Sequence, residues 1–235
     1  GKLNNQSPAP LVHRAQPAVV SITQATELGT VYTIDEILAI SEVCKQNNLP
    51  LHIDGARLAN AIVALGTTLA DCTWRAGVDI LSLGATKNGA FAAEAVVFFD
   101  ANKAADFEFR RKRGGHLFSK YRFLSSQLVP YLESNYWLDL AKNSNHRAKE
   151  LARGLEKIQS ITLSAEVETN MIFLQMPTSF VNFLKQENCL FYSWGEKEGM
   201  TSARFVTSFN TTEEEVDRFL NIIEKANSKA NSNSN

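Results

Sequence analysis

The sequence predicts an α/β fold: a large domain with a mostly parallel sheet, followed by a smaller α+β domain. Two observations support this. Short apolar segments alternate with helical segments over roughly the first hundred residues, which implies right-handed crossovers between parallel strands. Beyond a long helical stretch the order changes, and strands no longer alternate regularly with helices. A chain of 235 residues, 44% of them hydrophobic, is long enough for this arrangement.

Four short segments of the large domain have the apolar, β-branched character of buried strands. They are residues 18–23, 51–54, 79–83 and 96–99. Thr33 and Glu36 match a capping box, which predicts a helix that ends at about Gln46, before the Asn-Asn-Leu-Pro stop. Further helices are expected at 57–65 and 68–76. From 101 to 159 we expect long helices, broken near Gly114-Gly115 and Ser144.

The segments that follow predict the smaller domain. Strands are expected at 161–163, 171–175 and 204–207, and helices at 179–186 and 212–226. We place the domain boundary near Asn143, so that the large domain spans 1–142 and the small domain 143–226. Residues 1–17 are expected to form a loop. The Asn- and Ser-rich residues 227–235 are expected to be a disordered tail.

Composition argues against several classes of function. The formal net charge is −1, so neither a nucleic acid nor a membrane surface is an expected partner. The basic run at 110–113 is interpreted as a solvated helix end or an interface. The three cysteines form no CxxC pair and the histidine spacing does not indicate a metal site. Without a recognisable signal peptide or spanning segment, we expect a protein of the reducing cytoplasm.

Two residues that could take part in catalysis lie at or just after the ends of predicted strands. Asp54 stands where the segment Leu51–Asp54 leaves its strand, and Lys87 lies in a small-residue loop beyond the strand at 79–83. Ligands of open α/β sheets bind outside the carboxyl ends of the strands. An acid and a lysine at that edge suit pyridoxal phosphate (PLP). The lysine forms a Schiff base with the cofactor aldehyde, and the acid pairs with the pyridine nitrogen.

Spacing alone leaves the ordinary interpretations open. Most aspartates at strand ends form turns or helix caps, and most loop lysines are simply solvated. The segment GATKNG also lacks the glycine spacing of a phosphate-binding P-loop. His52 is expected to face the opposite side of its strand from Asp54, and His116 and Asn170 are expected to have structural roles.

Longer sequence segments distinguish between these interpretations. HIDGARLANA, SLGATKNGA, RRKRGGHLFSKYRFLSSQL, VETNMIFLQ and RFVTSFNTTEEEVDRFL occur in this order between Ile22 and Ile223. Together they resemble the threonine aldolases, which belong to the fold type I PLP enzymes and the β-eliminating lyase superfamily. The resemblance starts well inside the family sequence. The amino-terminal part of the family's large domain, with its Gly-Thr phosphate-binding turn and its ring-stacking histidine, has no counterpart here.

The resemblance implies a role for each matching residue. Lys87 holds the cofactor, and Asp54 pairs with its pyridine nitrogen. Arg57 lies near the phenolic oxygen and the substrate carboxylate, which Arg204 binds. Two further residues are expected near the cofactor phosphate, Thr86 through its hydroxyl and Arg122 across a dimer interface.

The implied activity is cleavage of L-threonine, L-allo-threonine and related β-hydroxy-α-amino acids to glycine and an aldehyde. Glu27 stands where many relatives carry a histidine near the substrate hydroxyl, which leaves the base for cleavage unassigned. The resemblance also implies a homodimer or homotetramer that acts on a small amino acid. Two alternatives remain: another fold type I PLP reaction such as β-elimination, or an inactive piece of such an enzyme.

Overall fold

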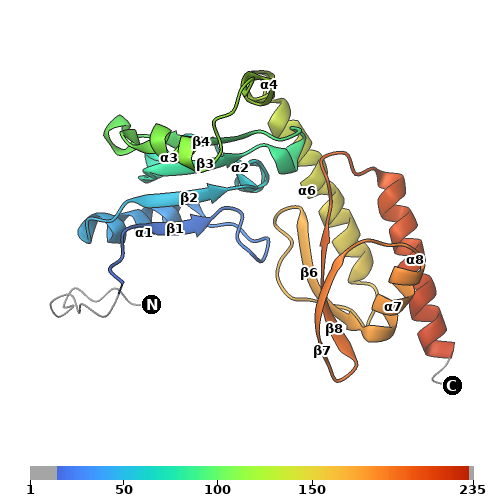
Figure 1. The fold of residues 1–235 in the computed structure, drawn as a ribbon. Helices are drawn as coiled ribbons and strands as arrows, with labels where there is room; N and C mark the ends of the chain where they lie inside the picture. The colour runs from blue at the N-terminus through green and yellow to red at the C-terminus, as the bar shows by residue number, and fades with distance from the viewer. Residues whose placement is uncertain (1–14, 233–235) are drawn as a thin grey trace.

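The structure is a computed structural model that describes residues 15–232 (Figure 1). The first sheet has the order β1-β2-β3-β4. Its strands are β1 (Val20–Thr23), β2 (Leu51–Gly55), β3 (Ile80–Gly84) and β4 (Glu94–Phe98). The first three are parallel and β4 is antiparallel to β3, so the expected mostly parallel sheet is confirmed. The loop expected at the amino terminus lies largely outside the described residues.

Helices cover one face of this sheet. Leu51, Ile53, Leu81 and Leu83 point to that face and are buried against the first core, which α1 (Ile34–Gln46) and α2 (Leu58–Leu65) complete. The residues between them in each strand are only half-buried on the other face. This alternation follows from the two-residue period of a strand.

The capping box at the start of α1 is confirmed. Thr33 Oγ1 accepts a hydrogen bond from the Glu36 N–H at 3.2 Å, and Glu36 Oε2 accepts one from the Thr33 N–H at 2.8 Å. The helix ends at Gln46, as expected. The helix expected at 68–76 is wrong: only a 3₁₀ turn forms at Trp74–Ala76, because Thr73 has φ −129° and ψ −103°, far from helical values.

The middle of the chain is a series of helices. They are a 3₁₀ turn at Ala101–Ala104, α3 (Phe107–Arg113), α4 (Arg122–Ser125), α5 (Leu128–Glu133) and α6 (Tyr136–Leu155). The break near Gly114-Gly115 is confirmed, and the basic run occupies the last turns of α3. The break near Ser144 is wrong, because α6 continues for 20 residues. Ser144 Oγ donates to the Ala141 carbonyl at 3.0 Å, so its hydroxyl is satisfied inside the helix.

The second sheet has the order β5-β6-β8-β7, and all of its neighbours are antiparallel. Its strands are β5 (Thr162–Leu163), β6 (Met171–Pro177), β7 (Tyr192–Lys197) and β8 (Met200–Val206). The helices α7 (Thr178–Gln186) and α8 (Glu213–Ser232) pack beside α6 to close a second core (Figure 1). The expected strands at 161–163, 171–175 and 204–207 are confirmed with altered ends, while β7 was not predicted.

The end of α8 corrects the expected disordered tail. Residues 227–232 continue the helix, and 233–235 lie outside the described residues. Buried Ala226 and partly buried Ala230 pack on the second core, while the Lys229 ammonium lies 4.4 Å from the centre of the Phe183 ring. Contacts at helical spacing therefore outweigh the polar composition of this segment.

Helix α6 belongs to both cores. Trp137 and Ala141 in its first half lie in the first core, whereas Ala148, Leu151 and Leu155 lie in the second. Within residues 15–232, no helix has both the length and the apolar character required to cross a bilayer.

Replacing Thr33 by Ala is expected to lower the free energy of unfolding by about 1 kcal/mol, because the side-chain acceptor for the Glu36 N–H is lost. Urea denaturation followed by circular dichroism measures this change. Thr33→Ser keeps the acceptor and should remain close to the parent. Equal destabilisation by both substitutions would show that the cap does not stabilise α1.

Candidate functional site

Asp54 and Lys87 lie at the same edge of the first sheet. Asp54 stands near the carboxyl end of β2, and Lys87 lies in a 3₁₀ turn, Thr86–Asn88, that follows β3. The two strands are parallel neighbours, with Asp54 paired to Ser82. Their carboxyl ends therefore leave the sheet side by side, which is where open α/β sheets bind ligands.

Two glycines allow these strand ends to approach closely. A Cβ atom on Gly84 would lie 2.7 Å from Ala56 Cα, and one on Gly55 would lie 2.8 Å from the Ser82 carbonyl oxygen. Asp54 Oδ1 accepts a hydrogen bond from the Ala56 N–H at 3.0 Å. This contact holds the half-buried carboxylate at the turn after β2.

The turn that carries Lys87 is fastened to the start of α6. The buried Asn88 donates from Nδ2 to Tyr131 Oη at 2.7 Å and to the Trp137 carbonyl at 2.8 Å. Gly89 has φ +109°, a conformation that suits glycine. Lys87 itself is exposed. The backbone beneath the amine is thus fixed while the side chain remains accessible.

Arg57 and Arg204 come from the two cores and influence each other. Arg57 stands immediately before α2, and Arg204 lies on β8. Burial lowers the pKa of Arg57, the positive charge of Arg204 lowers it further, and the negative charge of Glu27 opposes the shift. The Nε atoms of both arginines are buried and have no hydrogen-bond partner within the described chain. Such donors suit an anionic ligand between the cores.

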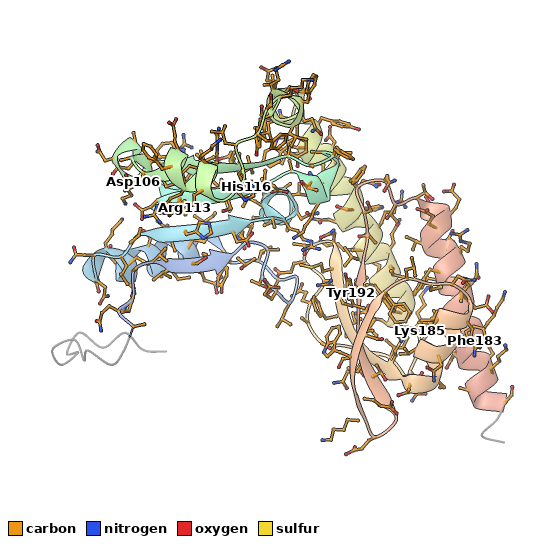
Figure 2. All side chains as sticks on the ribbon, viewed as in Figure 1. Asp106, Arg113, His116, Phe183, Lys185 and Tyr192 are labelled. Atoms are coloured by element: carbon orange, nitrogen blue, oxygen red, sulfur yellow. The ribbon has the colours of Figure 1, made fainter. Side chains whose placement is uncertain are left out.

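Tyr192 orients Arg204. The guanidinium carbon lies 4.6 Å from the centre of the Tyr192 ring, and the two residues are paired between β7 and β8. Tyr192 is labelled in Figure 2. Phe173, on the other side of Arg204 in the sheet, contacts the Trp194 ring edge-on at a centroid distance of 6.2 Å. Stacking of this kind restricts a guanidinium to one plane.

The loop after β1 spans both cores. Buried Gln24 donates to the Tyr32 carbonyl and accepts from the Tyr32 N–H, which closes the loop. On its second-core side, the Val31 N–H donates to Glu168 Oε2 at 2.9 Å, and Thr169 Oγ1 donates to the Gly29 carbonyl at 2.7 Å. Glu27 is exposed on this loop.

Thr86 and Arg122 are less closely associated with the other candidates. The exposed Thr86 donates weakly from Oγ1 to the Ala93 carbonyl, at 3.4 Å. Arg122 is exposed on the short helix α4, with its guanidinium carbon 5.0 Å from the Phe123 ring centre. Figure 1 shows α4 standing out from the body of the molecule near the start of α6.

The expected orientation of His52 is wrong. His52 and Asp54 are both half-buried on the open face of the sheet, while Leu51, Ile53 and Gly55 are buried on the other. Residues two apart in a strand share a face. The His52 ring hydrogen-bonds to Ser21 Oγ at 2.8 Å through Nδ1 and to Ser82 Oγ at 3.0 Å through Nε2.

Sequence reasoning missed Asn88 and Tyr192. The Asn-Gly pair at 88–89 indicates a turn, but the partners of Asn88 lie more than 40 positions away in the sequence. Tyr192 and Trp194 alternate with smaller residues, and this two-residue period could have indicated the missed strand β7.

Comparison with known proteins gives consistent results. Residues 3–178 match the family model described as Beta-eliminating lyase. The chain is 44% identical over 205 residues to a low specificity L-threonine aldolase of Pseudomonas sp. and 42% identical to one of Pseudomonas aeruginosa. Both alignments cover 87% of this chain and 58% of the relative, so the chain spans less than two thirds of the length of these relatives.

A solved structure is similar as well. The threonine aldolase of Leishmania major superposes with a TM-score of 0.85 at 29% identity, over 93% of this chain and 64% of that one. The α/β class predicted from the sequence is confirmed by this likeness.

Stability should depend on the protonation of His52. Burial lowers its pKa below the ordinary 6.5, and the Asp54 charge only partly offsets the shift. As the pH falls below 6.5, His52 is protonated in the unfolded chain before it is protonated in the folded chain. The free energy of unfolding therefore decreases until the pH reaches the folded-state pKa. We expect His52→Gln to lose less free energy of unfolding than the parent between about pH 7 and pH 5. Parallel urea titrations at each pH would contradict this if the two proteins lost stability equally.

Proposed function

Because the chain belongs to the Beta-eliminating lyase family, we propose that it acts as a PLP-dependent aldolase on L-threonine, L-allo-threonine and related β-hydroxy-α-amino acids. The products are glycine and an aldehyde, which is acetaldehyde for threonine. The observation that carries the proposal is the placement of Asp54 and Lys87 at the carboxyl ends of neighbouring parallel strands. The similarity to the two Pseudomonas aldolases supports the choice of substrate.

The residues present fit the cofactor. The Lys87 amine is exposed on a rigid turn, and the glycines at 55 and 84 keep the two strand ends close. Bound there, PLP would supply a ring that withdraws the electrons released when the Cα–Cβ bond breaks. We assign Lys87 to hold the cofactor covalently. Asp54 is assigned to keep the pyridine nitrogen protonated, which sustains that withdrawal.

Arg57 and Arg204 are assigned to the substrate carboxylate. Their buried Nε donors lack partners in the described chain, and burial in a low dielectric strengthens their attraction for an anion. The ring of Tyr192 under Arg204 favours one orientation of the guanidinium. An amino acid held in this way presents its side chain away from the carboxylate in a fixed direction, as cleavage of a chosen bond requires.

Thr86 and Arg122 are assigned to the cofactor phosphate, with Arg122 contributed by a second copy of the chain. Exposed aromatic side chains support such an interface: Phe123 on α4 is 65% exposed, Phe91 before β4 is 85% exposed, and Phe109 on α3 is 76% exposed. Large apolar residues exposed together typically mark an interaction surface. A homodimer, or a tetramer of two dimers, would cover them.

The family description itself favours a second reaction on the same cofactor, β-elimination. Product analysis distinguishes the two reactions. Glycine with an aldehyde identifies an aldolase, whereas ammonia with a keto acid identifies an eliminating lyase. If the purified chain forms neither set of products and binds no cofactor, it is an inactive piece.

Lys87→Ala is expected to reduce threonine cleavage by at least about 10³-fold, since both the covalent attachment and the amine that moves protons are lost. Acetaldehyde release coupled to an alcohol dehydrogenase measures the rate. Lys149→Ala removes an exposed lysine from α6 and serves as the matched control. Retention of the parental rate in Lys87→Ala would overturn the assignment.

Phe123→Asp should shift the assembly towards the monomer, because a charge cannot be buried at an apolar interface without a large penalty. Sedimentation velocity measures the shift. Leu190→Asp introduces the same charge at a residue between α7 and β7 that is 99% exposed, and it should leave the assembly intact. A parent that sediments as a monomer at all concentrations would contradict the proposed interface.

A further inference from the structure

A chain of buried hydrogen bonds joins the helix of Arg57 to α6. Asn60, in the first turn of α2, donates from Nδ2 to Ser144 Oγ and to Asn145 Oδ1, both at 2.9 Å. Asn145 Nδ2 donates in return to the Asn60 carbonyl at 2.9 Å. Asn60, Ser144 and Asn145 are at most 5% exposed. These bonds fix the position of α2 along α6.

A second set joins α6 to the strand of Arg204. Thr207, which follows β8, donates from Oγ1 to the Ser144 carbonyl at 2.7 Å. Its N–H donates to the Asn170 carbonyl at 3.1 Å, and Asn170 Nδ2 donates to the Thr207 carbonyl at 2.8 Å. Asn143 Nδ2 reaches the carbonyls of Phe209 and Thr211, each at 3.0 Å. The end of β8 is therefore held to the same turn of α6.

We propose that this polar junction sets the separation of Arg57 and Arg204, which makes Asn60, Asn145 and Thr207 positioning residues for recognition of the substrate carboxylate. The proposal rests on the proposed function, in which the two arginines bind that carboxylate. None of the three positioning residues touches the substrate. Asn60 acts on Arg57 through α2 and Thr207 acts on Arg204 through β8, while Asn145, on α6, acts on α2 through its hydrogen bonds with Asn60.

Apolar contacts and hydrogen bonds differ in how strongly they depend on direction. The apolar contacts of α6 with the two cores are non-directional, so they oppose separation of the cores more than sliding. Hydrogen bonds between buried groups have narrow distance and angle ranges, and a displacement leaves donors unsatisfied. Binding of a carboxylate by guanidinium groups on two sides is sensitive to such a displacement, because these hydrogen bonds require fixed geometry.

Thr207→Val tests the proposal, because the substitution removes the Oγ1 bond to Ser144 and nearly preserves the shape of the side chain. With the cofactor-loaded protein, titration calorimetry measures the binding of glycine and of methylammonium, which is glycine without its carboxylate. We expect glycine to bind about five- to tenfold more weakly, while the affinity for methylammonium stays unchanged. Thr207→Ser retains the hydroxyl and should restore glycine binding.

Thr201→Val is the matched control. Thr201 is also a buried threonine of the β8 segment, but its hydroxyl bonds to Thr178 Oγ1 at the start of α7 and not to α6. Its thermal unfolding temperature should fall about as much as that of Thr207→Val, with glycine binding at the parental level. A loss of glycine binding in Thr201→Val equal to that in Thr207→Val would assign the effect to general destabilisation and overturn the proposal.

Combination with Arg204→Lys distinguishes the assignment of the arginines to the substrate carboxylate from the positioning proposal. If Arg204→Lys binds glycine like the parent, the carboxylate assignment fails and the positioning proposal fails with it. If Arg204→Lys weakens binding and Thr207→Val does not, only the positioning proposal fails. The proposal is supported if Thr207→Val has no further effect once Arg204 is Lys.

A second variant covers the case in which Thr207→Val does not fold. Asn143→Ala removes two hydrogen bonds between α6 and the segment after β8, at a partly buried position. The same selective loss of glycine affinity is expected. Unchanged glycine affinity in Asn143→Ala would overturn the proposal in that case.

Discussion

Helix α6 must pack against two cores at once, and the placement of Lys87, Arg57 and Arg204 relative to one another depends on this constraint. Its apolar residues divide between the cores, with Trp137 and Ala141 in the first and Ala148 and Leu155 in the second. Between these halves the buried positions are polar. A helix that was apolar throughout would bind both cores but would leave its register undefined, whereas buried amides impose one register at some cost in desolvation.

The site is consequently a product of tertiary packing rather than of one motif. The Lys87 turn is attached to the start of α6 through Asn88, and the Arg57 helix is attached farther along it through Asn60. The strand of Arg204 joins the same middle turn through Thr207. One helix therefore fixes the positions of three segments that are distant in sequence. Their spacing along α6 follows from the helical rise of about 1.5 Å per residue.

Local sequence signals were enough to predict much of the fold. The capping box at Thr33, the apolar strands at 51–54 and 79–83 and the end of the helix at 65 are predicted from near neighbours, and each lies where the sequence predicts. The failures involve distant partners. A break was expected at Ser144 because its contacts with Asn60 and Thr207 cannot be inferred from neighbouring residues in the sequence. The polar tail is helical because it packs on the second core. The strand ends suggested Asp54 and Lys87, whereas only the resemblance implied a role for Arg204. These roles remain proposals; the parallel pairing of β2 with β3 accounts for the common edge at which Asp54 and Lys87 lie.

The loop that carries Glu27 is held at its base by Gln24 and Tyr32 and on its far side by Glu168 and Thr169. Surface connections usually tolerate insertions and deletions. Here an added or removed residue would shift the Gly29 carbonyl away from Thr169 or the Val31 amide away from Glu168. The length of this connection is therefore constrained by the second core, and grafts between homologues should exchange the loop together with residues 168–171.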